Sequence, residues 1–122
     1  MAGCYADGVT YGPPPAVTAA IRRFRALLER RFGPRLLELV LFGSHATGTA
    51  HEDSDVDLLV VIDGLTPGER TEVMDLATEA DAADREAWVG LAPLAYSEAQ
   101  AAELRSRERR LFRDIDRVGV RV

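Results

Sequence analysis

Two aspartates separated by one residue, Asp55 and Asp57, stand at the start of the apolar segment Leu58 to Ile62. Successive side chains of a β-strand point to opposite faces, so a strand here directs both carboxylates to the same side. Two anionic groups this close repel each other unless a cation lies between them. Carboxylate oxygens are the ligands that Mg²⁺ or Mn²⁺ prefers, and substrate phosphates often complete the coordination. The pair therefore predicts a divalent metal site.

A second motif, Gly43-Ser44, follows the apolar run 36–42, and ten residues separate Ser44 from Asp55. Glycine lets the backbone approach a ligand closely, and a turn of N–H groups favours a phosphate. The Ser44 hydroxyl adds a donor. Alone, a Gly-Ser pair is an ordinary turn and an Asp-x-Asp a solvated strand end. Their combination, each beside a buried strand, predicts a site for a nucleoside triphosphate and its metal.

The surrounding pattern indicates an α+β (α/β) domain with a small mixed sheet flanked by helices. Apolar residues at helical spacing predict helices over 15–32, 67–83 and 98–116, the last two opened by capping boxes at Thr66 and Ser97. On the last helix we expect Leu104, Leu111 and Ile115 to face inward. Short apolar runs predict strands over 36–42, 56–62 and 87–96, and alternating valines predict a short strand near 118–122. Residues 1–14 read as a flexible lead-in and 15–122 as the domain.

Residues 42–48 (FGSHATG) together with 54–60 (SDVDLLV) resemble the signature of the DNA polymerase β-type nucleotidyltransferase superfamily. At this length the chain is most similar to the minimal nucleotidyltransferases (MNT proteins), many of which are the antitoxin half of a HEPN/MNT toxin–antitoxin pair. The close similarity covers about 36–62, and the order of elements matches over about 15–118. The resemblance implies a polymerase β-like nucleotidyltransferase fold.

The resemblance also implies roles for individual residues. Gly43 and Ser44 would hold the triphosphate of ATP, and Asp55 and Asp57 would be the catalytic carboxylates that bind Mg²⁺ or Mn²⁺. AMP would then pass from ATP to an acceptor hydroxyl, such as a tyrosine of a partner HEPN toxin. In the family a third acidic residue lies on the next strand, yet residues 87–96 contain no Asp or Glu. The alternative is therefore a weakly active or inactive nucleotide-binding MNT antitoxin that acts by protein–protein contact.

The composition of the chain limits the kinds of partner that we expect it to bind. The 122-residue chain has a net charge of −5, which argues against general nucleic-acid binding. No apolar run approaches the roughly 20 residues of a membrane span, and we see no signal peptide, so we expect a cytoplasmic protein. An antibiotic-modifying transferase is least favoured, because such enzymes usually carry a further substrate domain. We expect association, either with a HEPN-domain protein or as a homodimer.

Three further residues are compatible with roles at this site. His45 and His51 flank the motif and could contact phosphate or metal, although solvated loop histidines are the simpler interpretation. Trp88 is the only tryptophan, and we expect it to pack against the protein rather than stack on a base.

Overall fold

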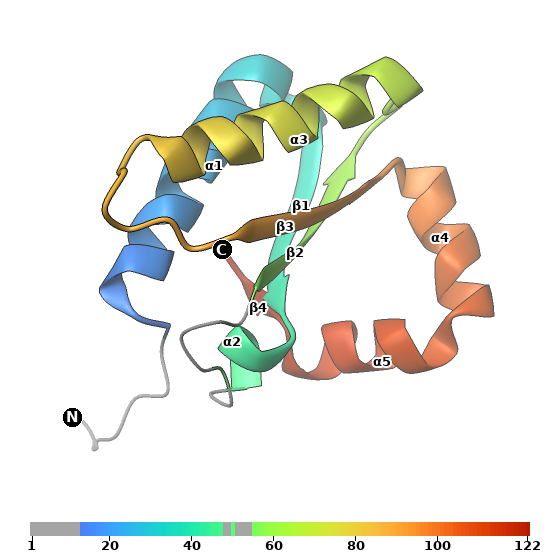
Figure 1. Ribbon diagram of the computed structural model, residues 1–122. Helices are drawn as coiled ribbons and strands as arrows, with labels where there is room; N and C mark the ends of the chain where they lie inside the picture. Colours follow the sequence, from blue (N-terminus) through green and yellow to red (C-terminus); the bar gives the residue numbers. More distant parts are fainter. Residues whose placement is uncertain (1–12, 48–49, 51–54) are drawn as a thin grey trace.

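A computed structural model describes residues 13–47, 50 and 55–122 (Figure 1). Its helices are α1 (Pro15–Phe32), α2 (Ser44–Thr47), α3 (Pro67–Ala82), α4 (Glu98–Arg107) and α5 (Arg109–Val118), with a 3₁₀ turn, η1 (Gly33–Arg35). Its strands are β1 (Leu36–Phe42), β2 (Val56–Ile62), β3 (Leu91–Tyr96) and β4 (Val120–Arg121). Most of the expected lead-in, residues 1–12, lies outside the described residues.

The four strands form one mixed sheet in the order β3-β2-β1-β4. β1 pairs antiparallel with β2 and with β4, whereas β2 and β3 run parallel. A parallel pair needs a crossover connection, and α3 supplies it between β2 and β3. The expected α+β class with a small mixed sheet is confirmed.

Helices cover both faces of this sheet (Figure 1). α1 and α3 pack on the first face, where Phe24, Leu28 and Val73 meet Leu58 and other buried strand residues. α4 and α5 pack on the second face, where Ala101, Phe112 and Ile115 contact alternate strand residues such as Leu59. The alternation along β2 therefore divides its side chains between two hydrophobic cores.

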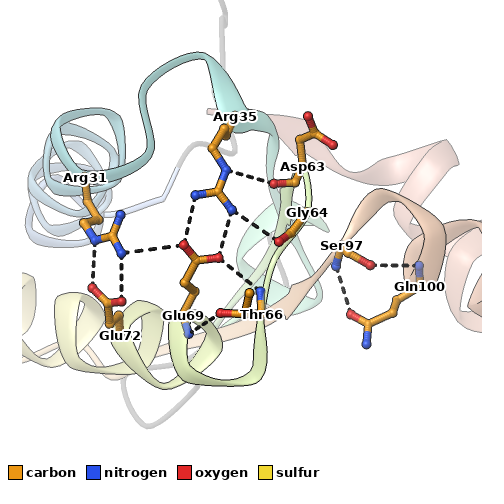
Figure 2. A network of polar contacts seen from close by, with 9 residues as sticks. All are labelled: Arg31, Arg35, Asp63, Gly64, Thr66, Glu69, Glu72, Ser97 and Gln100. Atoms are coloured by element: carbon orange, nitrogen blue, oxygen red, sulfur yellow. Dashed lines mark hydrogen bonds and ion pairs between the residues drawn. The ribbon is translucent and has the colours of Figure 1, made fainter.

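The predicted capping boxes are both present (Figure 2). At the start of α3 the Glu69 N–H donates to Thr66 Oγ1 over 3.2 Å, and the Thr66 N–H donates to Glu69 Oε1 over 3.1 Å. Ser97 and Gln100 make the same reciprocal pair before α4, at 3.1 and 3.0 Å. Each box satisfies two N–H groups that a helix end otherwise leaves without partners.

An arginine–glutamate network ties η1 and the end of α1 to the start of α3 (Figure 2). The Arg35 guanidinium donates to both carboxylate oxygens of Glu69, at 2.8 and 2.9 Å, and to the carbonyl oxygen of Asp63 at 3.0 Å. Arg31 donates to both oxygens of Glu72, at 2.8 and 2.9 Å. This network holds the carboxyl end of β2, opposite the end that carries Asp55 and Asp57.

Two expected elements differ from the structure. The strand expected over 87–96 begins only at Leu91, and the N–H groups of Val89 and Leu91 donate to the Asp81 side chain of α3. The helix expected over 98–116 is two helices, since Glu108 adopts the non-helical angles φ −103° and ψ 56°. The break turns Phe112 into the core, where it is 2% exposed, and leaves Leu111 38% exposed, so the expected inward position of Leu111 is wrong. None of the helices in the described ranges is long and apolar enough to cross a bilayer.

Candidate functional site

Asp55 and Asp57 lie at the amino end of β2, where they flank Val56. Asp57 is half-buried and pairs in register with Phe42, the last residue of β1, while Asp55 is exposed. The alternation of β2 places Asp57 on the second sheet face, which it shares with Leu59. The predicted carboxylate pair therefore stands at a strand end with one member open to solvent.

Gly43 leaves room for the Asp57 carboxylate. The backbone of Gly43 has φ 75°, and a Cβ atom built there would lie 2.5 Å from Asp57 Oδ2. Any other residue at this position would collide with the carboxylate and strain the backbone. Ser44 follows directly and begins α2. The fold thus brings the Gly-Ser turn against the aspartates, although residues 51–54 of the connecting segment lie outside the description.

Gly90 occupies the corresponding position beside Asp55. It has φ 77°, and a Cβ atom built there would lie 3.3 Å from Asp55 Oδ1. Its carbonyl oxygen accepts the N–H of Val56 over 2.9 Å, which joins the segment before β3 to the residue between the two aspartates. The position nearest Asp55 on the neighbouring segment therefore carries no side chain.

The electrostatics of the pair follow from its surroundings. Burial, followed by the nearby charge of Asp55, raises the pKa of Asp57 above its ordinary value of 3.8, and His45 partly opposes this rise. His45 is itself buried, at 6% exposure, so the interpretation of His45 as a solvated loop histidine is wrong. The raised pKa of Asp57 marks a place where a positive charge, such as a divalent cation, would relieve the repulsion between the two carboxylates.

The donor set fits a divalent cation that a substrate helps to bind. Two carboxylates are hard oxygen ligands, and the two glycines keep side chains away from them. Among residues 13–47, 50 and 55–122, no group of three or more His, Cys, Asp or Glu side chains is arranged to hold a metal ion. Such a two-carboxylate arrangement matches magnesium sites in which phosphate oxygens supply further ligands.

Other residues singled out by the sequence lie differently. Trp88 is 60% exposed, so the expectation that it packs against the protein is wrong. His51 lies outside the described residues. Sequence reasoning missed Asp81, whose side chain is 1% exposed and accepts the N–H groups of Val89 and Leu91. The only sequence signal for Asp81 is an acid on the buried stripe of a helix, next to Ala77 and Ala80.

Comparisons with known proteins identify similar sequences and one similar structure. The sequence model of the nucleotidyltransferase domain matches residues 21–111. Two proteins of Methanocaldococcus jannaschii, both named putative protein adenylyltransferase, are 54% identical over 37 residues and 41% identical over 44 residues. These matches cover 30% and 36% of this chain. They span only 25% and 44% of the relatives' own lengths.

One solved structure is similar over most of the chain. It is described as a toxin–antitoxin with AMP-PNP, and the superposition has a TM-score of 0.51 at 27% identity. The alignment covers 80% of this chain and 68% of that one.

Proposed function

Because the chain belongs to the nucleotidyltransferase domain family, we propose that it transfers a nucleoside monophosphate, AMP from ATP, to a hydroxyl group of a partner protein. The observation that carries the proposal is the close approach of Gly43 to Asp57, with Asp55 two residues away at the same end of β2. The adenylyltransferase names of the relatives and the AMP-PNP of the toxin–antitoxin structure support ATP as the donor. That structure also supports a toxin as the acceptor, and we propose a HEPN-domain tyrosine.

In this mechanism Asp55 and Asp57 would hold Mg²⁺, and the ion would supply positive charge that neutralises the triphosphate. Gly43 keeps the space beside Asp57 clear, and the Gly43-Ser44 turn receives the phosphate tail. The acceptor oxygen forms a bond to the α-phosphorus, the bond from that phosphorus to the β,γ-diphosphate breaks, and pyrophosphate leaves. The hydroxyl proton must pass to a base, which the substrate or another residue would supply, because both aspartates would hold the cation.

The test uses two forms of labelled ATP with purified protein, Mg²⁺ and a candidate HEPN partner. Label from the α-phosphate should appear on the partner, whereas label from the γ-phosphate should not, because it leaves with pyrophosphate. The double variant Asp55→Ala/Asp57→Ala should lose transfer, and Asp63→Ala should keep it, because Asp63 follows the opposite end of β2. Transfer by the double variant would contradict the assignment.

A second function is favoured by one observation, the glycine at position 90. Since the position closest to Asp55 on the neighbouring segment offers no oxygen ligand, the chain could bind nucleotide and partner without efficient transfer. In that case no label appears on the partner, while ATP binding and capture of the HEPN protein persist. The labelling experiment separates the two functions directly.

A further inference from the structure

A buried carboxylate in α3 lies one step away from the candidate site. Asp81 is 1% exposed, and its Oδ1 and Oδ2 accept the N–H groups of Val89 and Leu91 over 3.0 and 2.8 Å. Burying a carboxylate is costly unless hydrogen bonds replace the lost water. Here each oxygen receives its own backbone donor, one on either side of Gly90. Asp81 therefore fixes the backbone on both sides of that glycine.

Gly90 in turn contacts Asp55 and the next residue, Val56. Its carbonyl oxygen accepts the Val56 N–H over 2.9 Å, and its Cα faces Asp55 closely enough that a Cβ would lie 3.3 Å from Oδ1. Val56 is fully buried, and its neighbours along the chain are Asp55 and Asp57. A continuous chain of contacts thus runs from Asp81 through Gly90 to the backbone that sets the spacing of the two carboxylates.

We propose that Asp81 is a positioning residue for the divalent cation site. It holds Gly90 against Val56, so that Asp55 and Asp57 keep a spacing that can bind the metal. This inference rests on the proposed function for the metal itself. It gives the buried carboxylate a role that stabilisation of α3 alone would not require, since its two bonds go to the segment that lines the site. Residues that orient metal ligands commonly alter metal affinity by roughly 10- to 100-fold when changed.

The decisive variant is Asp81→Asn, which keeps the side-chain shape. Its amide offers one oxygen acceptor and presents an NH₂ group to the second backbone N–H, so one bond is lost and two donors face each other. The matched control is Val73→Ala, a fully buried change in the same helix that loosens its packing on the first core but leaves both Asp81 bonds intact.

Two measurements separate positioning from stability. Mn²⁺ binding is followed by electron paramagnetic resonance titration at a temperature at which all proteins are folded. Hydrogen exchange of the Val56 amide is followed in the absence of metal. We expect Asp81→Asn to weaken Mn²⁺ binding roughly tenfold or more and to speed exchange at Val56. Val73→Ala should bind Mn²⁺ as the natural sequence does. If Asp81→Asn is hard to purify, an osmolyte that favours the folded state allows the same titration.

Two results would overturn the proposal. The first is natural Mn²⁺ affinity in Asp81→Asn, and the second is an equal loss in both variants, which would mean that stability alone matters. Failure of the natural protein to bind Mn²⁺ would instead refute the proposed metal function. The exchange rate at Val56 would then still decide whether Asp81 holds Gly90 in place.

Discussion

At the scale of single residues, the site depends on the absence of side chains at Gly43 and Gly90. We expect Gly43→Ala to lose metal binding and to destabilise the fold by about 1–3 kcal/mol through backbone strain, with a further cost from the collision with Asp57 Oδ2. Thermal unfolding and Mn²⁺ titration would measure both effects. Gly68→Ala is the control, because a Cβ at Gly68 meets nothing within 4 Å and sits in the first turn of α3. Equal stability of the two variants would refute the close approach.

We expect the ionised Asp57 carboxylate to lower the stability of the metal-free folded protein. Burial and the charge of Asp55 raise its pKa above 3.8 in the folded protein, so the folded state holds this proton more tightly than the unfolded chain. Without metal, the stability of the natural protein should therefore fall as the pH rises from 3.8 through the raised pKa. Asp57→Asn should lack this fall and be the more stable protein at neutral pH.

Denaturant unfolding across that pH range, without metal, measures the difference between the two proteins. Added Mn²⁺ should then stabilise the natural protein more than Asp57→Asn, because the variant lacks one of the two carboxylates that would hold the ion. If the unfolding free energies of the two proteins vary with pH in the same way, the pKa of Asp57 is not raised by its surroundings.

Gly90 offers the opposite experiment, a gain of ligand. Aspartate tolerates a positive φ better than most residues, and its Cβ atom at position 90 would lie 3.3 Å from Asp55 Oδ1. We expect Gly90→Asp to bind Mn²⁺ more tightly, on the order of tenfold, because a third charged oxygen joins the site. Calorimetric titration measures the change, and Gly90→Asn separates the effect of charge from that of bulk. Weaker Mn²⁺ binding by Gly90→Asp would show that the ion does not lie between position 90 and the aspartates of β2.

At the scale of elements, the arginine–glutamate network fixes α3 against η1. The Arg35 guanidinium lowers the pKa of Glu69 to about 2 from 4.5. The stabilisation from this carboxylate is therefore complete above pH 4.5 and is lost as the pH falls toward 2. Glu69→Gln should unfold at a lower temperature than the natural protein at neutral pH, and the gap should close in acid. Glu79→Gln, an exposed change in the same helix, should leave the acid profile unchanged.

Element boundaries show where sequence reasoning succeeds. The helix over 15–32 and the strands over 36–42 and 56–62 have the predicted bounds, because periodicity and flanking Gly and Pro define them locally. The capping boxes at Thr66 and Ser97 were equally readable, since they involve residues three positions apart.

The features that sequence reasoning missed depend on partners far along the chain or on a local conformation without a sequence marker. The first residue of β3, Leu91, donates its N–H to Asp81 in another element, and the burial of His45 comes with its place near Asp57. Neither contact leaves a local pattern. The break at Glu108 has no Gly or Pro to announce it, and its result is to rotate α5 so that Phe112 reaches the second core. The aspartates and Gly43 were predictable as a group, whereas the role of Gly90 beside them was not.

At the scale of the whole molecule, the sheet separates two cores of unequal size. The smaller one, under α4 and α5, contains Phe112 and Ile115 against Leu59. Phe112→Ala should cost about 3–5 kcal/mol of unfolding free energy by opening a cavity in this core, whereas Leu111→Ala should cost about 1 kcal/mol or less. Urea unfolding of the two variants compares neighbours on one helix. A larger loss for the Leu111 variant would contradict the break at Glu108.

The pairing of β4 with β1 also orders events during synthesis. Arg121 and Val120 pair with Val40 and Leu41, and the Val122 N–H donates to the Leu39 carbonyl oxygen, so this edge joins residues separated by most of the chain. A ribosome releases β1 long before β4. Until residues 120–122 emerge, the outer edge of β1 presents hydrogen-bonding groups that any other nascent strand could take. Because this edge closes only when a strand made much later arrives, we expect the yield of folded protein to depend on the speed of translation or on a chaperone.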